Sequence, residues 1–219
     1  MDMDHAALER QRQHWQTVFA DNPNMYGPDP SEPGRFAVKA FTREGARDVL
    51  ELGPGQGRDT LALLDSGLRV NALDYATDVL TSLQESADAR GVGHQLEVLA
   101  HDVRDPLPLP DGAVDGVYSH MLFNMALSTV ELDELAREVH RVLRPGGLHI
   151  YTVRHTGDAH YGTGIAHGDS MFEHGGFIVH FFDRALVEQL AAGYTQLELL
   201  EFEEGDLPRR LWRITLRKE

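Results

Sequence analysis

The fold is decided by one stretch of the sequence, Val49-Leu50-Glu51-Leu52-Gly53-Pro54-Gly55-Gln56-Gly57-Arg58-Asp59-Thr60. It begins with mostly apolar residues, as a buried strand does, and its three alternating glycines predict a tight turn. The apolar residues that follow Thr60 predict a helix. Glycines let the backbone approach a ligand closely, and the start of a helix presents free N–H groups to that ligand. The stretch therefore predicts a nucleotide-binding corner.

Two residues distinguish this corner from a site for NAD or FAD. The dinucleotide fingerprint requires a third glycine or an alanine at the position where this chain has Arg58. Glu51, just before the turn, would repel a pyrophosphate and attract a cation. The segment Glu51–Gly57 resembles motif I of the class I S-adenosylmethionine-dependent methyltransferases. The cofactor of that family carries a sulfonium and an ammonium group, which suits an acidic corner.

Composition narrows the class of protein. The chain has 219 residues, 42% hydrophobic and 25% charged, which is typical of one soluble globular domain. A formal net charge of -15 disfavours a nucleic-acid substrate, because the field of the protein repels phosphate. The absence of cysteine excludes disulfides, thiolate metal sites and a cysteine nucleophile. The acidic N-terminus lacks the apolar region of a signal peptide and no apolar run reaches membrane-spanning length, so we expect a cytoplasmic protein.

Strands and helices alternate from residue 47 onward, which predicts an α/β fold with a mostly parallel sheet. The resemblance implies a doubly wound sheet of seven strands, with helices on both faces and an antiparallel C-terminal strand. We expect a single domain over residues 1–219. It consists of N-terminal cap helices (1–44), a cofactor-binding core (45–153), a His- and Gly-rich lid insertion (154–182) and a C-terminal helix with two strands (183–219).

The cap begins with an amphipathic helix, expected from Asp4 to Ala20, which has Leu8, Trp15 and Phe19 on or near one side. A loop containing Tyr26 follows. Aromatic residues in such a segment most often pack the cap against the core. The alternative is that the segment covers the cofactor and substrate cleft, as N-terminal lids do in the resembled family.

Asp74 is the first test of the nucleotide-binding interpretation. It ends the second expected strand, about 20 positions after Gly53, where an acidic residue accepts hydrogen bonds from ribose hydroxyls. A carboxylate at the end of a strand can instead cap the following turn. Its position behind a glycine corner favours the ribose role.

The resemblance implies further cofactor contacts. It assigns the adenine amino group to Asp102 and the adenine ring to the backbone of Val103, although Asp102 could instead start a turn. It also places Ser119 and His120 beside the methionine portion of the cofactor. The complete set of expected cofactor-binding residues is Glu51, Gly53, Gly55, Gly57, Asp59, Asp74, Tyr75, Asp102, Val103 and Ser119. The family branch that methylates amino groups of DNA and RNA carries an Asn- or Asp-Pro-Pro-aromatic signature, which this chain lacks after the fourth strand.

The insertion at 154–182 contains five of the 12 histidines of the chain. Three explanations remain open. The histidines lie on the surface of a flexible lid, or one or two of them act as a base or an anchor in a substrate pocket, or they bind a metal. No pair has a recognised metal-binding spacing such as H-E-x-x-H, so we expect no metal site.

The expected reaction is methyl transfer to a small molecule by in-line displacement. The protein mainly aligns the acceptor with the methyl group and excludes water. A base is needed only if the acceptor must lose a proton, and the candidates are His120, His155 and His160. The alternatives are a nicotinamide-dependent oxidoreductase and a cofactor-binding protein without catalytic activity. The sequence identifies neither the acceptor, nor the methylated atom, nor the oligomeric state.

Overall fold

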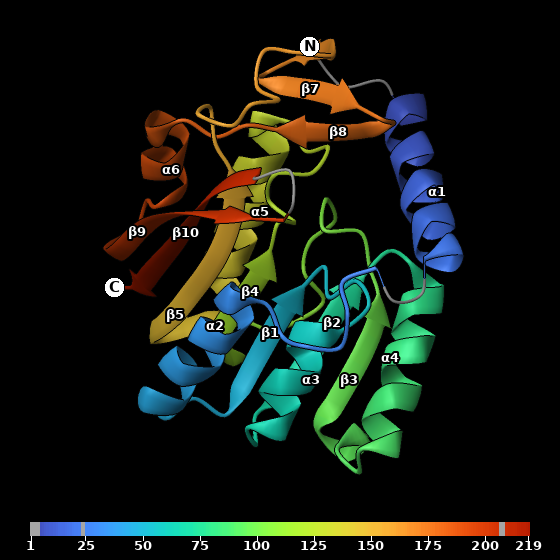
Figure 1. Ribbon diagram of the computed structural model, residues 1–219. Helices are drawn as coiled ribbons and strands as arrows, with labels where there is room; N and C mark the ends of the chain where they lie inside the picture. Colours follow the sequence, from blue (N-terminus) through green and yellow to red (C-terminus); the bar gives the residue numbers. More distant parts are fainter. Residues whose placement is uncertain (1–4, 23–24, 206–208) are drawn as a thin grey trace.

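A central sheet of seven strands organises the molecule (Figure 1). The computed structural model describes residues 5–22, 25–205 and 209–219. The strand order is β3-β2-β1-β4-β5-β10-β9. The strands are β1 (Asp48–Leu52), β2 (Arg69–Asp74), β3 (Leu96–Ala100), β4 (Val114–His120), β5 (Leu143–Arg154), β9 (Tyr194–Glu204) and β10 (Arg209–Lys218). Strands β1 to β5 are parallel, and β10 is antiparallel to both of its neighbours, so the predicted sheet is confirmed.

Helices cover both faces of the sheet, as expected. They are α1 (His5–Asp21), α2 (Glu32–Arg43), α3 (Arg58–Asp65), α4 (Thr77–Ala89), α5 (Thr129–Val142), α6 (Arg184–Leu190) and a short 3-10 helix at Gly93–Gln95. Leu50 and Leu52 of β1 pack in a core cluster with α5 and α6, whereas Val49 packs in a second cluster with α2 and α3. Because successive side chains of a strand point to opposite faces, β1 is buried from both sides.

The structure confirms two helix caps that the sequence predicts, but not the turn predicted before the fifth strand. Ser128 and Glu131 form the capping box that begins α5, and Asp183 caps α6. The turn expected at 144–147, however, lies within β5, which begins at Leu143 rather than at the expected Leu148. The pairing with β4 shifts register at this place, so the Pro-Gly-Gly sequence forms an irregularity of the strand.

The insertion at 154–182 contains a small antiparallel sheet instead of being only a loop. Its strands are β6 (Ile165–Gly168), β7 (Met171–His174) and β8 (Phe177–His180). The side chain of Gln11 in α1 donates to the carbonyl of Gly176 at 2.6 Å and accepts from the N–H of Ile178 at 3.1 Å. The insertion therefore holds α1 in place, and Figure 1 shows α1 meeting the start of β8.

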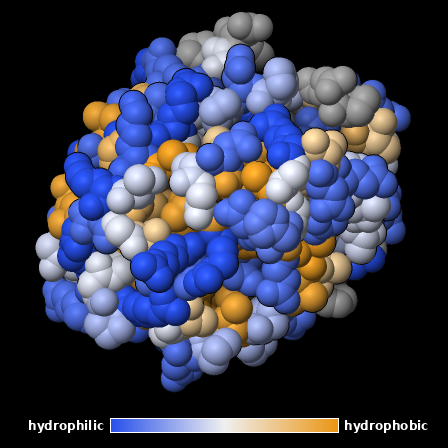
Figure 2. All heavy atoms as spheres, turned by 90° about the horizontal axis from the view of Figure 1, so that it is seen from below, coloured by the Kyte–Doolittle hydropathy of each residue, from blue (hydrophilic) through white to orange (hydrophobic). Residues whose placement is uncertain are grey.

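The carboxyl ends of the parallel strands point upward in Figure 1, and their amino ends point downward. Ion pairs join neighbouring strands near the amino ends, such as Arg69 with Asp48 at 2.7 Å. Figure 2 views the molecule from below and shows hydrophilic residues interspersed with hydrophobic ones. In the described part of the chain, no helix combines the length and the apolar character that crossing a membrane requires.

Candidate active site

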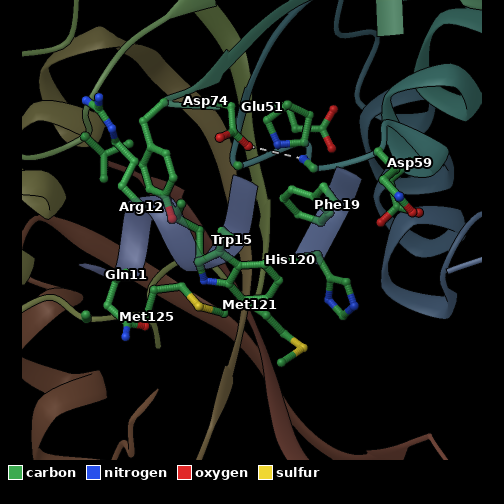
Figure 3. A pocket seen from close by; sticks show the side chains of 18 of the residues that line it. Gln11, Arg12, Trp15, Phe19, Glu51, Asp59, Asp74, His120, Met121 and Met125 are labelled. Carbon is green, nitrogen blue, oxygen red and sulfur yellow. Dashed lines mark hydrogen bonds between the residues drawn. The ribbon is translucent and has the colours of Figure 1, made fainter. Parts of the chain in front are cut away.

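A pocket lies at the carboxyl ends of β1, β2, β3 and β4, where open α/β sheets bind their ligands. The sheet side is formed by Glu51, the glycine turn, Asp74, Tyr75, Asp102, Val103, Arg104 and the segment 120–122. The opposite side is formed by Gln11, Arg12, Trp15 and Phe19 of α1, with Tyr26, Met125, Ala126, Leu127 and Glu204. Figure 3 shows Trp15 and Phe19 pointing into the pocket, with Glu51 and Asp74 on one side of them and His120 on the other.

Glu51 forms an acidic corner of the pocket. Glu51 is only 3% exposed, and its Oε2 atom has no hydrogen-bond partner among the described residues. Burial raises the pKa of Glu51 to about 8, because the charged carboxylate loses its hydration. A buried carboxylate with one unpartnered oxygen favours a cationic ligand, which would restore the charged form.

The glycine turn and Asp74 are joined by a hydrogen bond. The carboxylate of Asp74 accepts from the N–H of Gly55 at 3.3 Å, the dashed line in Figure 3, and from the N–H of Ala76 at 2.9 Å. Gly55 has a positive φ of 52°, a conformation that disfavours other residues. Gly53 also lines the pocket, whereas Gly57 lies outside it, because it begins α3 and packs against Leu83.

Asp59 lines the pocket, but its carboxylate is engaged in structural contacts. It accepts hydrogen bonds from the backbone N–H and the hydroxyl of Ser31 and from the hydroxyl of Tyr118, each at 2.7 Å. The hydroxyl of Ser31 in turn accepts from the N–H of Gly34 and caps α2 at 2.9 Å. Asp59 thus fixes the start of α2 next to α3, and a cofactor contact stays a prediction for it.

The remaining expected cofactor residues divide into two groups. Tyr75, Asp102 and Val103 line the pocket after β2 and β3. Burial raises the pKa of Asp102, but hydrogen bonds and the charge of Arg104 outweigh this effect, so the pKa is below its ordinary value. Ser119 does not line the pocket, and its buried hydroxyl has no partner among the described residues.

His120 belongs to a hydrogen-bonded group at the other side of the pocket. Its Nδ1 atom lies 2.8 Å from the hydroxyl of Thr152, and its Nε2 atom lies 3.2 Å from Oε2 of Glu204. The other carboxylate oxygen of Glu204 accepts from Arg58 at 3.3 Å. Burial alone would raise the pKa of Glu204, but its contacts with His120 and the charge of Arg58 lower it to about 2.

His155 and His160 lie outside the pocket. His155 is 4% exposed and stacks on Trp212, with ring centroids 4.5 Å apart. His160 stacks on His174 at the same distance, and its Nδ1 atom lies 3.0 Å from a guanidinium nitrogen of Arg154. Only His120 of the three candidate bases therefore faces the pocket.

The insertion shapes the pocket without lining it. None of its described residues is in the pocket wall, and no three metal-binding side chains cluster in the described parts of the chain. His180, at the end of β8, donates from Nδ1 to the carbonyl of Leu127 at 2.7 Å, and its backbone N–H donates to Asn124 at 2.9 Å. These bonds hold the loop that forms one wall.

Several pocket residues were not predicted as site residues. Trp15, Phe19 and Tyr26 had two open interpretations, and the structure places all three in the pocket wall. Met121 has a positive φ of 64°, which is uncommon for a residue with a side chain, and no signal in the sequence indicates it. Glu204 ends β9, which two strands separate from β4 in the sheet, and no signal in the sequence indicates its contact with His120.

Comparison with known sequences finds matches to part of the chain. Residues 49–147 match a family model described as methyltransferase domain. The chain is 34% identical over 118 residues to an uncharacterised methyltransferase of Mycobacterium tuberculosis. That match covers 54% of this chain and 44% of the relative, so the chain spans less than half of that protein's length.

Comparison with solved structures supports the fold. A Burkholderia thailandensis 1,6-didemethyltoxoflavin-N1-methyltransferase, solved with 1,6-didemethyltoxoflavin and S-adenosylhomocysteine, has a TM-score of 0.76 at 20% identity. The alignment covers 100% of this chain and 91% of that one. The [4+2]-cyclase SpnF has a TM-score of 0.71 at 18% identity, with coverage of 97% and 96%.

Proposed function

We propose that this chain, whose residues 49–147 match a methyltransferase-domain model, binds S-adenosylmethionine and transfers its methyl group to a small molecule. The observation that carries the proposal is Glu51, a buried carboxylate with an unpartnered oxygen at the glycine turn. A sulfonium or ammonium group supplies the positive charge that such a carboxylate requires. A pyrophosphate would add negative charge at the same place.

The residues around Glu51 fit the rest of this cofactor. Asp74 lies at the end of β2 beside the glycine turn, where its carboxylate can accept from ribose hydroxyls. Asp102 and Val103 lie at the end of β3, the place that the resemblance assigns to adenine. Arg104 now pairs with Asp102, so an adenine amino group would share or replace that partner.

The cofactor supplies a methyl carbon that is activated by the sulfonium. The chain's own contribution is to orient the acceptor and to exclude water. Trp15 and Phe19 of α1 cover the pocket with apolar surface, opposite the strand ends. Holding the reacting atoms in alignment can lower the barrier by several kcal/mol, in the range of roughly 7–11 for ideal cases.

His120 is the group placed to handle a proton if the acceptor loses one. Because Glu204 is ionised, the Nε2 atom of His120 carries the proton of their hydrogen bond. Thr152 faces the Nδ1 atom. Both ring nitrogens of His120 are thus occupied by Thr152 and Glu204, so His120 would accept a departing proton after it moves away from one of these partners.

A small-molecule acceptor is favoured over nucleic acid by the formal net charge of -15. The structural neighbour from Burkholderia, which is named a 1,6-didemethyltoxoflavin-N1-methyltransferase, supports the same proposal. A cytoplasmic location is part of this proposal and is supported by the composition of the chain. Fractionation of the cells that make the protein would test the location.

A cofactor-binding protein without methyl transfer is the second candidate. The observation that favours it is the similarity to SpnF, which is named a cyclase, because one fold can serve different reactions. Parallel calorimetric titrations with S-adenosylmethionine, S-adenosylhomocysteine and NAD test the cofactor. Binding of NAD alone would overturn the proposal in favour of an oxidoreductase. Acceptor-dependent formation of S-adenosylhomocysteine then separates an enzyme from a binding protein.

A further inference from the structure

Cationic side chains outnumber carboxylates around Glu204, which lines the His120 side of the pocket. A guanidinium nitrogen of Arg58 lies 3.3 Å from Glu204, and one of Arg209 lies 3.9 Å from it. Both arginines thus share a single carboxylate, and His120 adds an imidazole. In a chain with a formal net charge of -15, such a local excess of positive charge indicates a site for an anionic group.

The guanidinium of Arg58 has N–H donors that no described residue accepts from. It lines the pocket, and its side chain is only 19% exposed. A guanidinium carries five N–H donors, but the described residues accept from it only at Tyr26 and Glu204, both at 3.3 Å. The remaining donors of Arg58 are not fully buried, so they stay accessible to a ligand, and one that supplies anionic oxygens would form charge-assisted hydrogen bonds with them.

Aromatic rings border this end of the pocket. The guanidinium carbon of Arg58 lies 5.2 Å from the ring centre of Tyr26, and the rings of Trp15 and Phe19 are also 5.2 Å apart. Flat side chains in a pocket wall favour a flat ligand, because rings stack at such distances. The pocket thus combines an anion-binding group with aromatic surface.

We propose that the methyl acceptor is a small planar molecule that presents a carboxylate or another anionic oxygen to Arg58 and His120. This inference rests on the proposed function, because it names the acceptor class of the same pocket. Glu204 orients Arg58 and His120 before the acceptor binds. It also competes with the anionic oxygen for both of them, so its removal tightens binding of the anion.

Three probes test the acceptor class by calorimetry on protein saturated with S-adenosylhomocysteine. Benzoate is planar and anionic, benzamide is planar and neutral, and cyclohexanecarboxylate is anionic but not planar. Benzoate is expected to bind about tenfold more tightly than either of the others, since one charge-assisted contact contributes about this factor. Equal binding of benzoate and benzamide by the unmodified chain overturns the proposal.

Substitutions of Arg58 and Glu204 test whether the anion binds at these residues. Arg58→Gln is expected to abolish the preference for benzoate over benzamide, Arg58→Lys to retain part of it, and Glu204→Gln to tighten benzoate binding severalfold. Arg90→Gln is the matched control, because Arg90 forms an exposed ion pair with Asp65. Equal losses in the Arg58→Gln and Arg90→Gln variants would assign the preference to net charge and overturn the proposal. Thermal melts of each variant verify folding.

The same titrations without S-adenosylhomocysteine separate this inference from the proposed function. If S-adenosylhomocysteine does not bind but benzoate is still preferred and depends on Arg58, the proposed function fails and the anion site stands. If S-adenosylhomocysteine binds and benzoate has no preference over benzamide, the proposed cofactor stands and the acceptor class is wrong.

Discussion

Glu51 shows how a single side chain couples the stability of the domain to its ligand. The carboxylate is buried beside the glycine turn, and Asp59 and Asp74 lie close enough to raise its pKa further. An unliganded pocket therefore holds Glu51 in its protonated form near neutral pH. A cationic ligand reverses this preference, because it stabilises the charged carboxylate.

We predict that this coupling appears in the pH dependence of unfolding. The pKa of Glu51 is about 8 in the folded state against an ordinary value of 4.5, so the folded state holds a proton that the unfolded state releases between these values. The free energy of unfolding therefore falls as the pH rises through this window. Relative to Glu51→Gln, the unmodified chain is expected to lose on the order of 3 kcal/mol between pH 5 and pH 8.

Urea unfolding of both proteins at several pH values measures this difference. Other titrating groups are common to the two proteins and cancel in the comparison. Parallel pH profiles would show that Glu51 titrates normally and would remove the basis for a cation at this corner. Saturating S-adenosylmethionine is expected to flatten the profile of the unmodified chain.

Asp74→Ala is predicted to weaken binding of S-adenosylmethionine by roughly tenfold or more, since hydrogen bonds to a charged group contribute about 1.5–3 kcal/mol. The domain should still fold, because the hydrogen bonds of the carboxylate come from backbone N–H groups of the adjacent turns, those of Gly55, Tyr75 and Ala76. Calorimetry measures the affinity. Asp78→Ala, in the exposed first turn of α4, is the control. Unchanged affinity in a folded Asp74→Ala protein would exclude the ribose assignment.

Among the secondary-structure elements, α1 covers one side of the pocket, and its contacts with β8 hold α1 in this position. Gln11 spans the two by bonding to the backbone on both sides of Phe177, and the ring of Phe177 lies 4.7 Å from that of Trp15. Helix α1 is therefore attached mainly through β8, while its side chains on the same side line the pocket. Elements held by few contacts open more readily than the core.

We predict that Gln11→Ala increases the opening of α1 without unfolding the sheet. The loss of two hydrogen bonds, each contributing about 1 kcal/mol, should speed hydrogen exchange in α1 by roughly tenfold or more. Binding of S-adenosylhomocysteine should weaken severalfold, because Trp15 and Phe19 leave the pocket wall when α1 opens. Thr17→Ala on the exposed side of α1 is the control. Identical exchange in the two variants would contradict the anchoring role of β8.

The sequence predicts an element well when the residues that determine it are neighbours in the chain, and poorly when they are distant. The turn at Gly53–Gly57 follows from neighbouring residues and was predicted together with Asp74. The contact between Glu204 and His120 was not predicted, because it joins the ends of two strands, β9 and β4, that are distant in the chain and are not neighbours in the sheet. The strands β6 to β8 were missed since their Gly- and His-rich sequence lacks the alternation that marks a strand.

At the scale of the whole molecule, the pocket collects residues from positions 11 to 204, so a ligand joins segments from nearly the entire chain. Helix α1, the glycine turn, the ends of β2 to β4 and the end of β9 all contribute to its wall. A ligand that binds only the assembled pocket must therefore stabilise the folded state as a unit.

We predict that S-adenosylhomocysteine at 100 times its dissociation constant stabilises the protein by about 2.7 kcal/mol. For a chain of this size, each kcal/mol shifts the melting temperature by about 2–4 °C, so the expected increase is roughly 5–10 °C. NAD at the same concentration should cause no shift, because its pyrophosphate brings no positive charge to Glu51 and Arg58 occupies the position of the third glycine. Differential scanning calorimetry measures both shifts. A shift with NAD equal to that with S-adenosylhomocysteine would mean that the charge of Glu51 does not select the ligand.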